Sequence, residues 1–377
     1  MESGDSLDPM PCSRTIVHTE SSLGWGGQEI RIFREMEAMR ARGHRLFLAA
    51  QPASRIRSEA EKAGFEVWTI SEKSYRFPDS IARLALKLRG VKADVVNTHS
   101  SKDGWIGGMA ARLAGVPCLL RSRHIDVDYP SPSRARFAYG KLPHHVLTTS
   151  EAIRSKLVDE VGLRSDAVTC VPTGIDPEIF HPGCPPVLRS EGLVPAGTPL
   201  IGMISVIRSW KGHRFFIEAA ARVAAERPDV RFAIAGDGPG LPGLPKLVAE
   251  AGLAGRVLVL GHRDDVPGLL ASLDVLVLPS TAHEGVPQII LQAQLCGCPV
   301  IGTRVGGIPE VVEDGATGRL VAPSDGAALA GAMLAHLADP KASRRMAEAA
   351  RSRALERNTL SCMCARLEEI YGRFAGR

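Results

Sequence analysis

The sequence predicts a parallel α/β protein that consists of two doubly wound units. Short apolar runs alternate with helix-length amphipathic segments, as they do when crossover helices bury both faces of a parallel sheet. This alternation stops in a proline-rich stretch near the middle of the chain and then restarts. A chain of 377 residues is also longer than one hydrophobic core usually organises. We therefore expect two domains, each with a sizeable core.

The first unit contains six predicted strands, each a short apolar run followed by a segment of helical period. The loop after the first strand is rich in glycine and leads into a long amphipathic helix that ends at Gly43. The predicted strands are TIVHT (15–19), LFLAA (46–50), VWTI (67–70), DVVNTH (94–99), CLLRSR (118–123) and HVLTTS (145–150).

The second unit repeats the pattern after the proline-rich stretch. Its last segment carries apolar Leu367, Ile370 and Phe374 at helical spacing, which predicts a C-terminal helix. The predicted strands are LIGMISVI (200–207), VRFAIAG (230–236), RVLVLG (256–261), DVLVLP (274–279) and PVIGT (299–303).

These patterns divide the chain into five segments. We expect a disordered N-terminus (1–13), a first Rossmann-like domain (14–182), a linker (183–198), a second Rossmann-like domain (199–358) and the C-terminal helix (359–377).

Composition excludes several classes of protein. The formal charge of +5 is a mild surplus, and no basic run with interleaved aromatic residues favours nucleic acid as a partner. The eight cysteines are scattered without the spacing of a metal site, so we expect reduced thiols and no metal. No signal peptide or membrane-spanning run is found, which predicts a cytoplasmic protein.

The richest segment for function runs from Ser280 to Pro323. A buried strand delivers Pro279 and Ser280 to the carboxyl edge of a sheet, and Pro287 then starts a helix whose first turn has unpaired amides. Such a helix start attracts anions. Glu284, just before it, adds a carboxylate that accepts hydrogen bonds from hydroxyl groups. A ligand with hydroxyls and phosphate, such as a sugar nucleotide, fits this combination.

This segment resembles the C-terminal signature of glycosyltransferase family 4. The matching features are the proline-serine strand end, Glu-Gly, a second acidic position eight residues on, and then GxPVI, GG, PE and TG. The resemblance extends over nearly the whole chain from about Thr15. It implies a GT-B fold, in which two Rossmann-like domains face a cleft and the C-terminal helix packs back on the first domain.

The resemblance also implies roles for the residues of this signature. Glu284 would lie beside the donor sugar, and the position eight residues on would lie beside the ribose of the donor. Here that position is Gln292, whose neutral amide still hydrogen-bonds a diol, though more weakly than a carboxylate. The start of the helix would contact the donor through Gly285, Val286, Pro287 and Gln288.

Two cations follow the first strand of the second unit. Arg208 and Lys211 stand where a diphosphate would meet them, and each would stabilise the departing nucleotide by ~3 kcal/mol. No metal is then required. The competing interpretation is that both are solvated loop residues. The family places its arginine further ahead of the lysine, so the match of Lys211 is the closer one.

Four further sites of the second unit have two interpretations each. Gly236, in FAIAGDGPG, does not fit a dinucleotide fingerprint, and is either a turn beside the nucleotide or a purely structural turn. The backbone at His262 either meets the base or belongs to a solvated loop. Gly306 and Gly307 predict a turn or a close approach of backbone. Glu310 is either a capping charge or a ligand contact.

The first unit offers a glycine pair and two histidines. Gly26 and Gly27 let backbone amides approach a ligand at a helix start, and the resemblance places them against the donor diphosphate and the acceptor. His99 and His124 end strands, at the edge where open α/β sheets bind ligands. His124 matches the family's histidine near the donor sugar. His99 and Arg123 are expected on the acceptor side.

Basic residues also gather in the first unit, with leucines among them. They form either an ordinary solvated face or a surface for peripheral membrane contact, since many relatives use lipid-linked acceptors. The basic residues are Lys73, Arg76, Arg83, Lys87 and Arg89, with Leu84, Leu86 and Leu88 between them.

The sequence therefore predicts a retaining glycosyltransferase that moves a hexose from a nucleotide-diphosphate sugar to a glycan or lipid-linked acceptor of envelope polysaccharide or lipopolysaccharide synthesis. No dedicated base is found, in agreement with the same-face mechanism usually proposed for the family, in which the departing phosphate takes the acceptor's proton. Two alternatives stay open. One is a sugar-nucleotide epimerase of the same architecture, and the other is a non-catalytic relative that only binds the nucleotide sugar.

Overall fold

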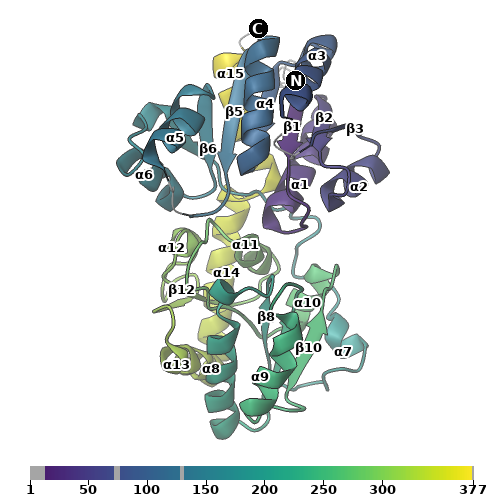
Figure 1. The fold of residues 1–377 in the computed structure, drawn as a ribbon. Helices are drawn as coiled ribbons and strands as arrows, with labels where there is room; N and C mark the ends of the chain where they lie inside the picture. Colours follow the sequence, from purple (N-terminus) through teal and green to yellow (C-terminus); the bar gives the residue numbers. More distant parts are fainter. Residues whose placement is uncertain (1–12, 72–76, 128–130, 376–377) are drawn as a thin grey trace, which may run out of the picture.

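The computed structural model describes residues 13–71, 77–127 and 131–375. It shows two lobes, built from the two halves of the chain, and the last two helices run along both of them (Figure 1). The segment predicted to be disordered lies outside the described residues apart from Ser13, and so do Lys73 and Arg76 of the predicted basic face.

The first domain is built on a sheet of seven strands within the described residues, and all the pairs are parallel. The order is β3-β2-β1-β4-β5-β6-β7, so it reverses between β1 and β4. Ligands of open α/β sheets bind at the carboxyl edge beside such a reversal. The strands are β1 (Thr15–Glu20), β2 (Arg45–Ala50), β3 (Glu66–Thr69), β4 (Val95–Thr98), β5 (Cys118–Arg123), β6 (His145–Thr148) and β7 (Val168–Cys170).

The second domain repeats this topology with six parallel strands in the part of the chain that is described. Its order is β10-β9-β8-β11-β12-β13, with the reversal between β8 and β11. The predicted fold class is thereby confirmed. The strands are β8 (Leu200–Ile204), β9 (Arg231–Ala235), β10 (Val257–Gly261), β11 (Val275–Leu278), β12 (Val300–Thr303) and β13 (Arg319–Val321).

Every predicted strand is present, but β7 and β13 were not predicted. Both are three-residue strands at the edge of a sheet. An edge strand of that length has too few apolar positions to produce a recognisable pattern, because the sheet buries it from one side only.

The helices cover both faces of each sheet. In the first domain they are α1 (Gly27–Ala41), α2 (Arg55–Lys62), α3 (Phe77–Val91), α4 (Ser101–Ala114), α5 (Pro132–Arg136) and α6 (Glu151–Asp159), with short turns η2 (Phe137–Lys141) and η3 (Ser165–Ala167). In the remainder they are α7 (Val187–Ser190), α8 (His213–Glu226), α9 (Leu244–Glu250), α10 (Val266–Ser272), α11 (Gln288–Leu295), α12 (Ile308–Val311), α13 (Gly326–Ala338), α14 (Pro340–Arg357) and α15 (Leu360–Phe374), with turns η4 (Ser209–Lys211) and η5 (Leu241–Gly243).

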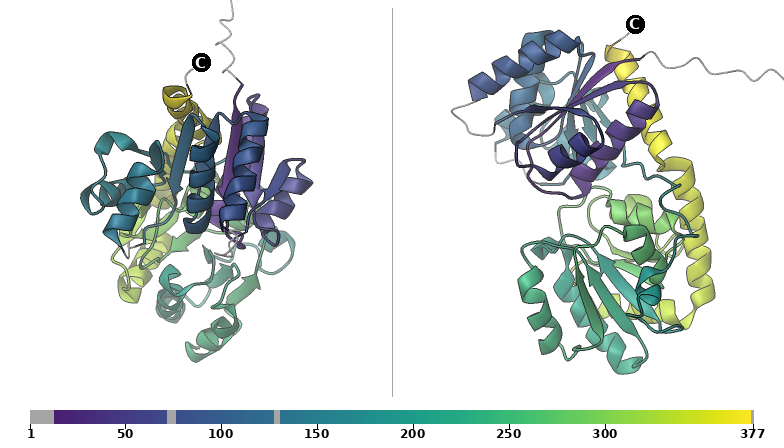
Figure 2. Two further views of the ribbon diagram at one scale, coloured as in Figure 1. Left: turned by 45° about the horizontal axis from the view of Figure 1, so that its top comes forward. Right: turned by 90° about the vertical axis from the view of Figure 1, so that its right-hand side faces the viewer.

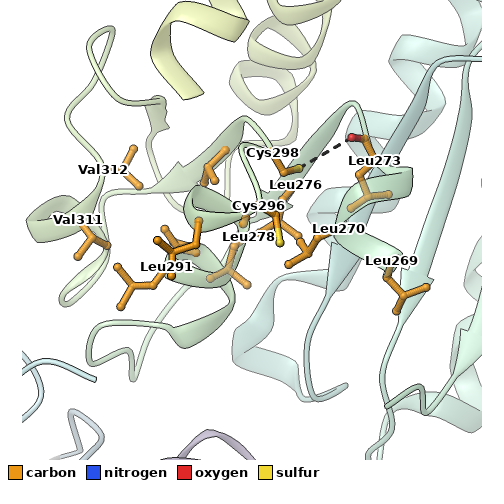
Figure 3. Packing of buried hydrophobic residues seen from close by; sticks show 14 of the residues in the cluster. Leu269, Leu270, Leu273, Leu276, Leu278, Leu291, Cys296, Cys298, Val311 and Val312 are labelled. Carbon is orange, nitrogen blue, oxygen red and sulfur yellow. Dashed lines mark hydrogen bonds between the residues drawn. The ribbon is translucent and has the colours of Figure 1, made fainter. Parts of the chain in front are cut away.

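Alternation along the strands assigns neighbouring residues to separate clusters of the core in each domain. Ile16 and Val17 are neighbours on β1 and belong to different clusters of buried residues. Leu276 and Val277 on β11 divide in the same way. Figure 3 shows one of the clusters in the second domain, where Cys298 packs as a buried apolar residue and its thiol points at the carbonyl of Leu273. The sheets are thus rigid platforms that fix the loops at their edges.

The C-terminal helix returns to the first domain, as the resemblance implies. The backbone of Ile175 is bonded to Asn358 and Leu360 at the crossing, at 2.9 Å in both hydrogen bonds. From there α15 packs against α1, with Ile370 and Tyr371 fully buried (Figure 2). A second chain crossing therefore ties the domains together in addition to the linker. The exact domain boundaries stay predictions.

The described part of the predicted basic face lies on α3. Arg83, Lys87 and Arg89 are exposed there, whereas Leu84 and Leu88 are buried in the core and Leu86 is 66% exposed. The leucines therefore serve mainly the interior, and the outer face is basic with one apolar side chain. Among the described residues, no helix is both long enough and apolar enough to cross a membrane.

Candidate functional site

The carboxyl edges of the two sheets meet across a set of close contacts. Nδ1 of His283 lies 2.7 Å from the carbonyl oxygen of Asp126, and the side chain of Gln288 donates to the carbonyl of Gly27. A Cβ atom on Gly285 would lie 2.6 Å from the carbonyl oxygen of His124. Segments that follow strands in each domain therefore face one another at the reversal points of both sheets.

An ion pair between a half-buried lysine and a buried glutamate occupies the second-domain side. Lys211, on the loop after β8, donates to Oε1 of Glu284, on the loop after the neighbouring strand β11, over 2.6 Å. Ser280 donates to the same oxygen over 2.5 Å. Their side chains are 19% exposed for Lys211 and 6% for Glu284. Residues 73 positions apart are thus brought together, and a cation is held beside Glu284, in the loop that leads into α11.

Glycines allow the backbone to pack around this pair. Gly306 has φ +51°, and a Cβ there would lie 2.0 Å from the carbonyl oxygen of Glu284. Gly212, directly after Lys211, has φ +77°, and its Cβ would lie 1.9 Å from the carbonyl oxygen of Pro279. Both positions need glycine for conformation and for space. The close approach predicted for the GG motif is present, and its partner is the Glu284 loop itself.

His283 is a strained residue that the sequence did not single out. It has φ +61°, in the left-handed region that non-glycine residues seldom adopt, although histidine does so more often than most. Its ring packs edge-on against Trp210, with centroids 5.6 Å apart. The strain sits directly before Glu284, so the conformation that aims the carboxylate is held by contacts to both domains.

Two helix starts point at the same region. Gly26 caps α1, and its amide donates to Oε2 of Glu29 over 2.8 Å. Pro287 precedes α11 in an extended conformation and Val286 is buried. Since Gln288 at the start of α11 reaches Gly27 at the start of α1, the positive ends of both helices adjoin. Gln292 lies one turn further along α11 and is half-buried, with no partner recorded for its side chain among the described residues.

Glu310 caps a helix, but not its own. Its carboxylate accepts from the amides of Glu151 and Ala152, at 2.8 and 2.9 Å, at the start of α6 in the first domain. Burial raises the pKa of this carboxyl, against the opposing effect of the two amides. The capping interpretation is therefore correct in kind, and the contact joins the two domains.

The histidines of the first domain form a chain. His124, after β5, places Nε2 2.9 Å from Nδ1 of His99, and Nε2 of His99 is 2.9 Å from Nδ1 of His18 on β1. His124 is 8% exposed, and His99 and His18 are more deeply buried. Burial lowers the pKa of all three, that of His18 to about 3. The prediction that His99 faces the cleft needs correction, because both of its ring nitrogens are turned to the neighbouring histidines.

The other predicted residues lie nearer the surface or in turns. Arg208 is exposed, with its guanidinium 5.2 Å from the ring centroid of Trp210. Arg123 donates to Tyr139 and to the carbonyl of Val127. Exposed His262 contacts Asp264 at 3.0 Å and Arg55 of the first domain at 3.4 Å. Gly236, at φ +144°, packs against the carbonyl of Ser205, which accounts for it as a structural turn.

Sequence reasoning missed Ser280 as a partner of Glu284. It also missed His283, His18 and Glu35, whose Oε1 lies 3.7 Å from Nε2 of His18. Ser280 had a signal, because it was part of the quoted strand end. His18 lies inside a buried strand and Glu35 inside an amphipathic helix, where nothing distinguishes them in the sequence. No cluster of three or more metal-ligating side chains is found in the described residues.

Comparison with known proteins identifies the family. Residues 25–179 match the model of Glycosyltransferase Family 4, and residues 198–339 match that of Glycosyl transferases group 1. A 2-deoxystreptamine glucosyltransferase of Streptomyces kanamyceticus is 30% identical over 268 residues, which span 66% of this chain and 69% of the relative. A UDP-Gal:alpha-D-GlcNAc-diphosphoundecaprenol alpha-1,3-galactosyltransferase of Escherichia coli is 31% identical over 260 residues, 65% and 67% of the two chains.

Solved structures share the fold. A glycosyltransferase from Rickettsia africae superposes with a TM-score of 0.87 at 21% identity, covering 97% of this chain and 99% of that one. Anabaena HepE in complex with UDP and glucose gives 0.85 at 24% identity, covering 96% and 100%. The two-domain architecture is therefore GT-B. Because the two family models cover both domains and the relatives extend across them, the chain belongs to the group 1 glycosyltransferases of glycosyltransferase family 4.

Proposed function

We propose that the protein is a retaining hexosyltransferase that uses a nucleotide-diphosphate sugar as donor and a glycan or lipid-linked hydroxyl as acceptor. The observation that carries this proposal is the Lys211–Glu284 pair, which is partly buried at the reversal point of the second sheet, near the adjoining starts of α1 and α11. Such a site offers a cation and amide dipoles to a diphosphate, and a carboxylate to sugar hydroxyls.

The two members of the ion pair would bind different parts of the donor. The diphosphate would take Lys211 and the amide dipoles, with Arg208 turning in from the surface, and the sugar would take the carboxylate of Glu284. Gln292 would accept from the ribose, one helical turn from Gln288. His124 would meet the sugar from the first domain, since its backbone lies against Gly285. The glycines Gly26 and Gly27 would close over the phosphates.

Transfer then needs charge stabilisation more than a base. As the bond between the sugar and the phosphate breaks, negative charge grows on the departing diphosphate, and preorganised cations and dipoles stabilise it. The acceptor hydroxyl forms the new glycosidic bond on the same face, and its proton passes to the departing phosphate oxygen. The protein positions both substrates and excludes water through the contacts between the domains.

The relatives support the class of acceptor. The similar Escherichia coli enzyme is named for a diphosphoundecaprenol-linked acceptor, and a relative from Mycolicibacterium smegmatis for a phosphatidylinositol mannoside. Exposed Arg83, Leu86 and Arg89 on α3 would suit peripheral contact with an anionic membrane. Envelope polysaccharide or lipopolysaccharide synthesis agrees with the acceptors of these relatives and with the basic outer face of α3.

Incubation with a panel of nucleotide-diphosphate hexoses tests the proposal. We expect release of nucleotide diphosphate from at least one donor, and a product with retained anomeric configuration when lipid-linked or glycan acceptors are supplied. A C-epimer of the donor, formed without acceptor, would establish the epimerase alternative instead. Tight nucleotide binding with neither hydrolysis nor transfer would establish the non-catalytic alternative. Family membership favours transfer over both.

A further inference from the structure

The three histidines lead from the cleft to a buried carboxylate. His124 contacts His99 and His99 contacts His18, each at 2.9 Å, and Nε2 of His18 lies 3.7 Å from Oε1 of Glu35 on α1. Glu35 in turn accepts from the hydroxyl of Tyr371 on α15, over 3.3 Å. Five elements or their loops therefore contribute one side chain each to a single line of contacts.

Only the outer end of this line is open. Glu35 and His18 are 1% and 0% exposed, whereas His124 keeps 8%. Both nitrogens of His99 and Nε2 of His124 are in hydrogen bonds, and no partner for Nδ1 of His124 is found among the described residues. At the inner end, Nε2 of His18 is buried without a hydrogen bond, and Glu35 carries the adjacent carboxylate. A buried nitrogen in that position favours pairing with Glu35.

A neutral imidazole carries a proton on one nitrogen and accepts on the other, so the line has two self-consistent arrangements. With Glu35 protonated, and with its 3.7 Å separation from His18 shortened to hydrogen-bonding distance, the carboxyl donates to Nε2 of His18, each Nδ1–H donates outward, and Nδ1 of His124 is a donor. With Glu35 ionised, every Nε2–H donates inward and Nδ1 of His124 is an acceptor. The two arrangements differ by one proton, which enters or leaves at Nδ1 of His124.

The surrounding charges keep the histidines neutral and leave the carboxyl free to titrate. Burial and the cation of Arg31 lower the pKa of His18, and Arg31 with Arg121 acts on His99 and His124 in the same direction. Burial raises the pKa of Glu35 to about 7, against the opposing effects of Arg31 and Tyr371. The groups that face the line are Arg31 from α1, Arg121 and Arg123 from β5, and Cys364 and Tyr371 from α15.

We propose that Glu35, His18 and His99 are positioning residues that set the tautomer of His124, and thereby decide whether its Nδ1 donates to or accepts from the sugar donor. The inference rests on the proposed donor site for the identity of the ligand. The tautomer itself is a property of the free protein, so it can be measured whether or not transfer is observed.

The test is a long-range proton-nitrogen NMR correlation on the full chain labelled with ¹⁵N-histidine, with His124→Asn used for assignment. We expect His124 to carry its proton on Nδ1 at pH 5.5 and on Nε2 at pH 8.5, and this change to disappear in Glu35→Gln. One tautomer at both pH values, or a change that survives in Glu35→Gln, would contradict the proposal that Glu35 sets the tautomer of His124. Glu368→Gln is the matched control, since Glu368 also contacts a histidine, His44, at 3.0 Å, from a different position on α15 than Tyr371.

Tyr371→Phe keeps the test open if Glu35→Gln does not fold. The tyrosine hydroxyl favours ionised Glu35, so its loss should move the midpoint of the tautomer change up by about half to one pH unit. An unchanged midpoint would contradict the line of contacts. Once a donor is known, Glu35→Gln should also remove the corresponding step from the pH profile of kcat, whereas a merely structural role would lower activity equally at every pH.

Discussion

The two sides of the cleft are built in different ways. On the second domain, Ser280, Glu284 and Gly285 come from one loop, and Lys211 with Gly212 from another, so each contact belongs to a short sequence motif. On the first domain, the functional line draws on positions from 18 to 371. In the proposed function, the first arrangement would hold charge for a diphosphate, and the second would offer neutral groups that hydrogen-bond a sugar. The difference explains why sequence motifs reveal one side and not the other.

Breaking the charged side should have the largest effect. Lys211→Met and Glu284→Gln should each lower transfer by about 10³-fold or more. The first removes the cation that stabilises the charge of the transition state, and the second removes the carboxylate that accepts hydrogen bonds from the sugar. Lys211→Met should also cost up to ~3 kcal/mol of unfolding free energy, since it leaves a buried carboxylate unpaired. Initial rates and thermal unfolding measure the two effects.

Lys246→Met and Glu250→Gln are the matched controls, because they divide an exposed pair of the same kind at 3.7 Å on α9. Their rates should equal that of the wild type. The double variant Lys211→Met/Glu284→Gln should recover stability without activity. Near-normal transfer by either single variant of the buried pair would remove it from the site.

Gly306→Ala should disturb the same side through the backbone. A Cβ would lie 2.0 Å from the carbonyl of Glu284, so the loop must shift and transfer should fall by at least about 10²-fold. Gly315→Ala is the control for backbone strain alone, because Gly315 has φ +78° and no atom lies within 4 Å of a Cβ there. This substitution should lower the free energy of unfolding by only ~1 kcal/mol. Equal effects of the two changes on rate would mean that the close approach to Glu284 has no role.

Glu310→Gln probes the contact between the two sides. The charged cap on α6 would become a neutral one, which weakens closure by ~1 kcal/mol and should raise the KM for donor about 5-fold with kcat less changed. Glu313→Gln, at an exposed pair with Arg353 in the same region, should change neither constant. A KM that stays constant in Glu310→Gln would show that this cap does not contribute to closure.

On the neutral side, the buried carboxyl of Glu20 should affect the pH dependence of stability. Burial, and the charge of Asp103, raise the pKa of Glu20 to about 7. The folded protein therefore holds this proton more tightly than the unfolded chain, and the stability that it contributes falls as pH rises from about 4.5 to 7. The difference in unfolding free energy between wild type and Glu20→Gln should decline across that window by ~1 kcal/mol or more. A flat difference for Glu20→Gln would contradict a neutral carboxyl.

The smallest change is expected from Gln292→Glu. A carboxylate binds a ribose diol more strongly than an amide, so donor affinity should rise about 3- to 10-fold in calorimetry. A nucleotide that lacks both ribose hydroxyls is the control ligand, and its affinity should fall or stay the same. A gain of the same size for that ligand would place Gln292 away from the ribose.

Sequence reasoning recovered the two-domain architecture because β1 to β6 and β8 to β12 have strong apolar runs, and the edge strands β7 and β13 do not. It singled out Lys211 and Glu284, which the structure brings into contact, because their loops carry turn-forming glycines. It could not find the line of contacts from His124 to Glu35, since His18 and Glu35 lie in a strand and a helix whose patterns are explained by packing. Nor could it assign Glu310 to α6, because that contact joins residues 158 and 159 positions apart.

The central claim is that the site between the domains binds a diphosphate through Lys211. Calorimetric titration with nucleoside diphosphates and their hexose conjugates tests this claim most directly. We expect one site per chain for at least one nucleotide, weakened about 10-fold or more by Lys211→Met and unaffected by Lys246→Met. Equal affinity in wild type and Lys211→Met would contradict the account, and so would the absence of binding by every nucleotide of the panel.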